Sequence, residues 1–335
     1  MHVFLRSRLA CLLLLGAIIA AAPMLFPSRF YYEIGASIFI AGLAVVGLNL
    51  LMGFAGQVSL GHAGFWGLGG YAVAIGPAHL GIPPLASLGL GLLLSIAVAW
   101  AVGRPILRLR GHYLAVATLG FGFLVAMVLT NEADWTGGPD GMGVARLDIL
   151  GFVVRGSRLW YWVSAGVLLS GMWLALNIVD SPTGRALRAL HDSQVAAAIN
   201  GVDVARYKLA AFIISAAYAS LAGSMAAFSD AYITPASAGF LPSIELVSMS
   251  VLGGMGSVPG AVVGAAVLRA LPQVLTSLHD YEHLVLGFIM MLIMIFLPAG
   301  LVPSIAAVLG RRSQKSSKCE TESSAQGSAP AGGTA

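Results

Sequence analysis

The sequence predicts an all-α polytopic membrane protein with about ten transmembrane helices, some of them short or broken. Three observations support this fold class. The 335 residues are 58% hydrophobic and only 10% charged, whereas soluble domains have about 25% charged residues. The mean hydropathy is +0.88. The apolar residues also form separate runs, many of them close to the roughly 20 residues that cross a bilayer as a helix.

The apolar runs are the predicted spans. The third run is interrupted by glycine, and the eighth and ninth are short, so that 243–271 forms either two tilted spans or a re-entrant pair. The runs lie at 9–26, 34–53, 56–76, 84–102, 113–130, 160–179, 208–228, 243–256, 258–271 and 284–303.

The first run admits two interpretations. Arg6 and Arg8 precede it, and Ala20 and Ala22 form an A-x-A pattern before Pro23, as in a cleaved signal peptide. Because the run approaches spanning length, we expect an uncleaved first span.

The basic residues predict the orientation. Most of the 18 Lys and Arg lie at the N-terminus, in 103–112, in 180–207 with the start of the next run, and in the tail. The positive-inside rule then places both termini and loop 181–207 in the cytoplasm and loop 131–158 outside. The predicted permeation domain is the transmembrane part, 1–308, and the polar tail 309–335 is expected to be disordered.

Several function classes are excluded by what the sequence lacks. It has no Walker A motif for ATP phosphates, no H-E-x-x-H and no G-x-S-x-G, so an enzyme is not expected. Cys11 and Cys319 have no metal spacing, and we expect neither a metal nor a cofactor. The basic residues form no stripe with interleaved aromatics, which argues against nucleic acid. Ion-coupled carriers usually place Asp or Glu deep in the membrane. Among the 14 acidic residues, Glu245 is the clearest one inside a predicted span. Because one such carboxylate is little for ion coupling, uphill transport would need energy from a partner.

The stretch GFAGQVSLGHAGFWGLGGY, residues 53–71, places three polar residues among glycines. Gln57, Ser59 and His62 are costly against lipid, so we expect them inside the bundle. Gly61 and Gly64, with the other glycines, are expected to form one smooth helix wall. We predict that these five residues, with Glu245, line a translocation path. The alternative is a tightly packed structural helix, with Glu245 a paired carboxylate.

Residues 181–212 are too polar to span and too long for a tight turn. Ser181-Pro182 is a helix start signal, and Gly201 is expected to end the helix. A short amphipathic helix in a cytoplasmic loop either lies on the membrane surface or docks into a partner groove.

Four stretches resemble, in the same order, the permeases of branched-chain amino acid ABC importers of the LivM type. The resemblance as a whole covers most of residues 35–303. In the coupling-loop pattern E-A-A, three residues, then Gly, the residues Ala196, Ala197 and Gly201 fit, while Val195 stands in place of Glu. The stretches are NLLMGFAGQVSLGHAGFWGLGGYAVA (49–74), WTGGPDGMGV (135–144), SPTGRALRALHDSQVAAAINGVDVARYKLAAF (181–212) and SIELVSMSVLGGMGSVPGAVVGAAVL (243–268).

The resemblance implies an ABC importer permease architecture in a bacterial inner membrane. It implies pairing with a second homologous permease, two cytoplasmic ABC ATPase subunits and an external solute-binding protein. Residues 185–201 would sit in a cleft of the ATPase, with Arg185, Arg188, Asp192 and Gly201 as coupling residues. Segments 131–158 and 229–242 would meet the binding protein.

The solute implied is a branched-chain or related aliphatic amino acid. Permeases of the same type carry urea or short amides, which is one alternative. An ion-coupled secondary carrier is another.

Overall fold

The computed structural model describes residues 2–25, 28–109, 111–149, 152–274, 287–288, 291, 295 and 300–304. The tail 309–335 and most of the predicted tenth span, 284–303, lie outside the described residues.

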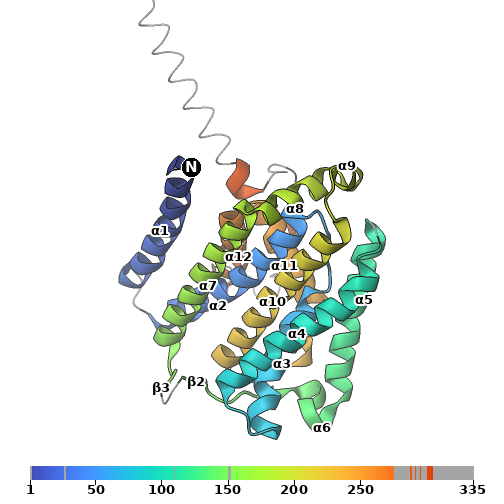
Figure 1. The fold of residues 1–335 in the computed structure, drawn as a ribbon. Coiled ribbons are helices and arrows are strands. Elements are labelled where there is room, and N and C mark those ends of the chain that lie inside the picture. The colour runs from blue at the N-terminus through green and yellow to red at the C-terminus, as the bar shows by residue number, and fades with distance from the viewer. Residues whose placement is uncertain are drawn as a thin grey trace, which may run out of the picture.

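Helices dominate the described chain (Figure 1). The long elements are α1 (His2–Leu25), α2 (Arg29–Asn49), α3 (His62–His79), α4 (Pro84–Ile106), α5 (His112–Asn131), α7 (Ser157–Asp180) and α10 (Val204–Asp230). The shorter helices are the π-helical turn η1 (Leu50–Phe54), α6 (Ala133–Thr136), η2 (Gly138–Asp140), α8 (Pro182–Asp192), α9 (Gln194–Ile199), η3 (Pro235–Ala238), α11 (Phe240–Gly253) and α12 (Val258–Val274).

The core of the bundle is built on α2 and α10. Helix α2 packs against α7, α10 and α12, and α10 packs also against α3 and α4. The most apolar windows of α2–η1 and α10 are 78% and 61% buried, against 22% and 28% for α4 and α5. Helices α4 and α5 therefore lie at the periphery and present apolar side chains outward.

Five of the described helices are long and apolar enough to cross a membrane: α2 with η1, α4, α5, α7 and α10. The apolar stretches Leu12–Pro23, Phe240–Gly253 and Val258–Gln273 are shorter. Helix α3 is not among the five, because glycine and histidine lower its hydropathy. The described chain is thus a multi-pass helical protein, and a total of about ten spans stays a prediction.

The third predicted run, 56–76, is not one helix. Residues 55–61 are non-helical, and α3 begins only at His62. The prediction of one glycine-walled helix was therefore wrong for Gly56 and Gly61. Gly56 has a left-handed φ of +65°, which β-carbon-bearing residues rarely adopt. At Gly61 a β-carbon would overlap the carbonyl group of Thr118 in α5. Residues 55–61 are called the helix break below.

The short segments predicted at 243–271 form a helical hairpin, α11–α12, which turns at residues 254–257. Asn49 at the end of α2 holds this turn. Its Nδ2 donates to the carbonyl oxygens of Gly254 and Ser257 at 3.3 and 3.0 Å, and its Oδ1 accepts from the Gly256 amide at 2.8 Å. Because Asn49 is fully buried, these bonds satisfy an amide that would otherwise be costly.

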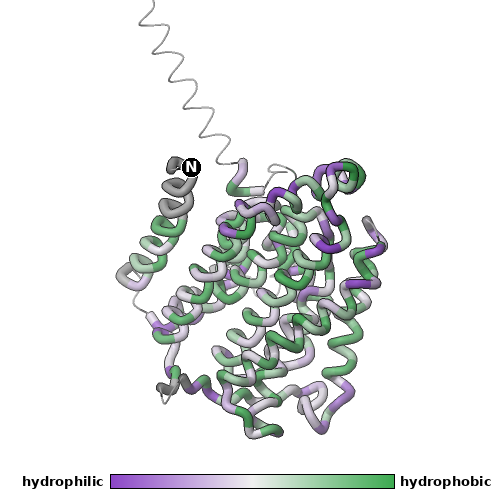
Figure 2. Tube along the Cα trace, viewed as in Figure 1, coloured by the Kyte–Doolittle hydropathy of each residue, from purple (hydrophilic) through white to green (hydrophobic). Residues whose placement is uncertain are grey.

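The connections gather at two ends of the bundle (Figure 1). The start of α1, the α4–α5 connection and α8–α9 lie at one end, here called the α9 end, and α6 with β2 and β3 lies at the other, the α6 end. Hydrophilic residues are frequent at both ends and hydrophobic ones between them (Figure 2). This grouping matches the loops that the charge pattern placed together.

The described part of the predicted loop 131–158 carries short strands that the all-α prediction did not include. Strand β1 (Met142–Gly143) pairs antiparallel with β4 (Tyr232–Ile233), and β2 (Asp148–Ile149) pairs with β3 (Phe152–Val153). The Tyr232 hydroxyl donates to the Asp140 carbonyl oxygen at 2.6 Å. The loop and segment 229–242 therefore form one joined surface.

Candidate functional site: a charged vestibule, a helix break and a protruding helix pair

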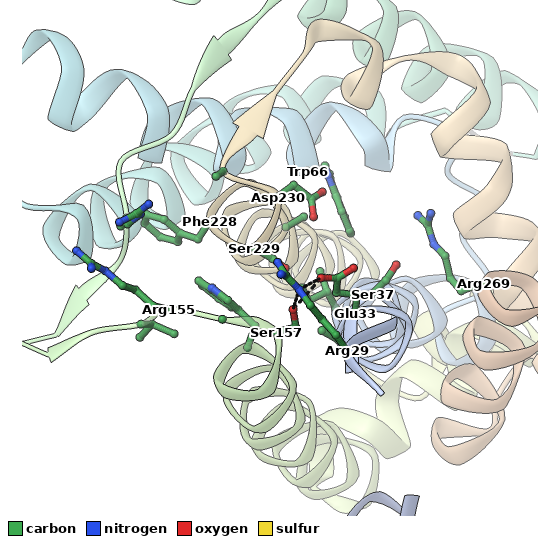
Figure 3. Close-up of a pocket in the computed structure, with 18 residues that line it drawn as sticks. Arg29, Glu33, Ser37, Trp66, Arg155, Ser157, Phe228, Ser229, Asp230 and Arg269 are labelled. Atoms are coloured by element: carbon green, nitrogen blue, oxygen red, sulfur yellow. Dashed lines mark hydrogen bonds and ion pairs between the residues drawn. The ribbon is translucent and has the colours of Figure 1, made fainter. Parts of the chain in front are cut away.

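A cavity of about 680 Å³ opens at the α6 end, between α2, α3, α7, α10 and α12. A second cavity of about 420 Å³ adjoins it, sharing Trp66, Ala226, Asp230 and Arg269. We call the two together the charged vestibule. Figure 3 shows Arg29, Glu33, Asp230 and Arg269 around the larger cavity.

The vestibule carries charges of both signs. On α2, Arg29 Nε lies 3.1 Å from Glu33 Oε1, which also accepts from the Ser157 hydroxyl at 2.7 Å. On the opposite wall, Arg269 Nη2 lies 3.8 Å from Glu245 Oε2. The Arg269 Nε is buried without a hydrogen-bond partner. Asp230, at the end of α10, lines both cavities.

Apolar groups separate these charges. Ala63, Trp66, Ile233, Pro242 and Leu246 line the smaller cavity beside Asp230, Glu245 and Arg269. Cationic and anionic groups around an apolar wall suit a small zwitterion with an apolar side chain, since each charge can be paired. Of these charged residues, only Glu245 was predicted from the sequence as a site residue.

The vestibule extends to the start of α3, because Ala63 lines the smaller cavity and follows His62, the first residue after the helix break. His62 is 1% exposed. Its Nδ1 lies 2.8 Å from the Ser59 hydroxyl oxygen, and its Nε2 lies 2.6 Å from that of Ser215 in α10. Both ring nitrogens are thus engaged, and the imidazole ties the break to α10.

Two further bonds fix the backbone around the break. The Leu60 amide donates to the Thr118 hydroxyl in α5 at 3.0 Å, and the Ala63 amide donates to the Ser243 hydroxyl in α11 at 3.1 Å. Side chains of three helices, α5, α10 and α11, thus bind the amides and the imidazole at the start of α3.

The expected interior position of the three polar residues is confirmed, with Gln57 and Ser59 each 2% exposed. Neither amide atom of Gln57 has a hydrogen-bond partner in the described structure, an arrangement that costs about 1–3 kcal/mol per group. The two candidate glycines pack against α5. Gly61 contacts Thr118, and a β-carbon on Gly64 would lie 3.2 Å from Gly122 Cα. Their part in a path stays a prediction.

The polar segment 181–201 is a protruding helix pair. Its predicted start at Ser181-Pro182 is confirmed, since the Ser181 hydroxyl caps α8 by accepting from the Gly184 amide at 3.4 Å. The helix pair ends before Gly201, which has a left-handed φ of +80°. The prediction of one continuous helix was wrong, because Ser193 is extended and caps a second helix, α9.

The predicted coupling residues occupy different environments. Arg188 Nη2 donates to the Val179 carbonyl oxygen at 2.7 Å, and Arg185 Nη1 donates to that of Asp180 at 3.5 Å. Arg188 therefore braces α8 against the end of α7, and Arg185 adds a weaker bond at the same place. Asp192 and Ala196 are exposed, whereas Ala197 is buried.

Two apolar side chains at the α9 tip were missed as candidates. Val195 is 65% exposed and Ile199 is 81% exposed. Their spacing of four puts them on one face of the helix. That spacing, within a segment of small and polar residues, was the available signal.

Fold and site together define a multi-pass transport permease: an apolar bundle with a charged vestibule at one end and a protruding helix pair at the other. The family model described as "Branched-chain amino acid transport system / permease component" matches residues 31–294. The chain belongs to this family.

Proteins of similar sequence are named as branched-chain amino acid transport permeases. The chain is 32% identical over 310 residues to the high-affinity branched-chain amino acid transport system permease protein LivM of Salmonella typhimurium, covering 85% of this chain and 73% of that protein. It is 24% identical over 280 residues to LivH of the same organism, covering 78% and 90%. A probable LivM of Methanocaldococcus jannaschii is 23% identical over 249 residues, covering 66% and 70%. No solved structure matches the chain.

Proposed function

We propose that the chain is the transmembrane permease subunit of an ABC importer that moves branched-chain or related aliphatic amino acids inward. The observation that carries the proposal is the contact between the protruding helix pair and the helix break. Helix α8 packs on η1, and His191 lies against Gly56. A displacement of α8 would therefore be transmitted to the backbone segment that carries Ser59 and His62.

Energy comes from a partner in this proposal. The sequence contains no Walker A motif, and ATP hydrolysis belongs to two cytoplasmic ABC ATPase subunits. The exposed pair Val195 and Ile199 fits an apolar cleft on such a subunit, in the helix-in-groove mode. The α9 end is then cytoplasmic, with both termini on that side of a bacterial inner membrane.

The relatives and the geometry support the remaining partners. The chain resembles both LivM and LivH, named as permeases of a high-affinity branched-chain amino acid transport system, which supports pairing with a second homologous permease. An external solute-binding protein docks on the joined surface of β1, β4 and α6. It delivers the solute to the charged vestibule.

The vestibule supports the amino acid class. Asp230 or Glu245 pairs the solute ammonium group, Arg269 pairs its carboxylate, and Trp66 and Leu246 contact its aliphatic side chain. Alternating access then requires the His62–Ser215 bond to open, since it ties the start of α3, next to the helix break, to α10.

The test is uptake by proteoliposomes that contain the chain with its ATPase and permease partners and the loaded binding protein. We expect ATP-dependent uptake of leucine, isoleucine and valine. Uptake of urea or acetamide in their place would refute the proposed solute, and uptake driven by an ion gradient without ATP would refute the importer class.

A further inference from the structure

A basic recess of about 730 Å³ lies at the α9 end, between the end of α4 and the start of α10. Arg104, Arg108, Arg206 and Lys208 line it, together with one acidic residue, Asp203. Asp203 caps α10, since its Oδ1 accepts from the Arg206 amide at 3.1 Å. The recess therefore has an excess of positive charge, at a helix N-terminus that adds a partial positive charge.

The recess adjoins the outward-facing surface of α4. The Arg104 guanidinium carbon lies 3.8 Å from the centroid of the Trp100 ring. Trp100 is 46% exposed, and tryptophan beside a basic residue near the end of a span is typical of the membrane–water interface. Further along α4, Leu93 and Leu94 are exposed. A headgroup in the recess would thus have its acyl chains on apolar helix surface.

We propose that the recess binds the phosphodiester of an anionic phospholipid, phosphatidylglycerol or cardiolipin. Arg104, Arg108 and Arg206 pair the phosphate oxygens, in the manner of basic pockets between helix ends. The rival occupant is an acidic segment of the ATPase. The geometry favours lipid because α4, the least buried of the candidate spans, forms one wall. Of the lining residues, α9 contributes Gln194 alone.

Native mass spectrometry of the purified full chain, titrated with phosphatidylglycerol or phosphatidylcholine, tests the site. We expect preferential binding of phosphatidylglycerol by the wild type. The double variant Arg108→Gln/Arg206→Gln is expected to bind it roughly 30-fold more weakly, from two lost cations near the membrane surface. Arg108→Lys/Arg206→Lys retains the charge and is expected to restore most of the affinity.

The matched control removes two exposed arginines at the α6 end, Arg146→Gln/Arg158→Gln, and is expected to leave phosphatidylglycerol binding unchanged. Equal loss in both double variants would overturn the site, and so would no loss in either. Millimolar inorganic phosphate that displaces the lipid would identify a free-phosphate site instead. Cross-linking of Arg108→Cys to the ATPase, with lipid binding unaffected by the glutamine variants, would assign the recess to the ATPase.

Discussion

His191 of α8 lies against Gly56 of the helix break. A β-carbon built on Gly56 would lie 3.0 Å from His191 Nδ1 and 3.4 Å from its Cα. The protruding helix pair thus contacts the segment that contains Ser59 and precedes His62. This contact links α8 to the helix break, which continues into His62 and Ala63 at the start of α3.

Replacing Gly56 by Ala should weaken this link. The left-handed backbone costs a β-carbon about 1–2 kcal/mol, and the new methyl group also pushes on His191. We expect solute transported per ATP hydrolysed to fall several-fold in proteoliposomes. Gly81→Ala is the control, because Gly81 has a similar φ of +62° and nothing within 4 Å. If solute transported per ATP hydrolysed were equal in the two variants, the contact would not transmit motion from α8 to the helix break.

Ile199→Asp should release the ATPase. The side chain is 81% exposed at the α9 tip, and losing a buried aliphatic contact costs about 1.5–3 kcal/mol, roughly 10- to 150-fold in affinity. Pull-down of the ATPase by the solubilised chain measures this. Leu80→Asp, at the α6 end and 58% exposed, should retain the ATPase. Retention by Ile199→Asp would place the docking surface elsewhere.

Arg188→Glu should uncouple hydrolysis from transport. It removes the bonds to the carbonyl oxygens of Val179 and Gly184 and sets a negative charge at the end of α7, where the helix dipole disfavours it. We expect solute-independent ATP hydrolysis with little uptake. Arg185→Glu should act more weakly, because its bond of 3.5 Å is marginal. The reverse order of effects would contradict the bracing role.

Gly61→Leu should prevent folding. Any side chain there meets the Thr118 carbonyl group across the α3–α5 contact. We expect loss of the monodisperse peak in size-exclusion chromatography. Gly120→Leu, on α5 with nothing within 4 Å, should keep it. A folded Gly61→Leu protein that fails only in uptake would instead support a place for Gly61 in the translocation path.

Asp230→Asn should raise the KM for leucine with little change in kcat, because the proposed ammonium partner loses its charge. Asp230→Glu, which keeps the negative charge, is the control and should keep the KM close to that of the wild type. A lower kcat with unchanged KM would assign Asp230 a part in conformational change rather than in solute binding.

Much of the bundle was predictable, because composition and the length of apolar runs report directly on lipid exposure. The runs at 34–53, 84–102, 113–130, 160–179 and 208–228 each lie in a helix of spanning length. The buried position of His62 was also predictable from the local sequence. An imidazole that faces lipid has no hydrogen-bond partner, which makes that position costly in free energy.

The features that were missed depend on contacts between distant segments. The Arg269–Glu245 pair joins α12 to α11, and β1 joins β4 across 90 residues of chain, so neither has a local signal. The helix break was placed within a helix because glycine spacing does not distinguish helix packing from a left-handed turn. The exposure of Ile199 depends on how α9 sits on α8.

The central claim, a permease driven by an ATPase that docks on α9, is tested most directly by purification from membranes that also contain the genomic neighbours. We predict that a second permease and the ATPase co-purify with the wild type, and that Ile199→Asp keeps the permease but loses the ATPase. A lone chain or a homodimer that moves leucine in liposomes without ATP would contradict the claim.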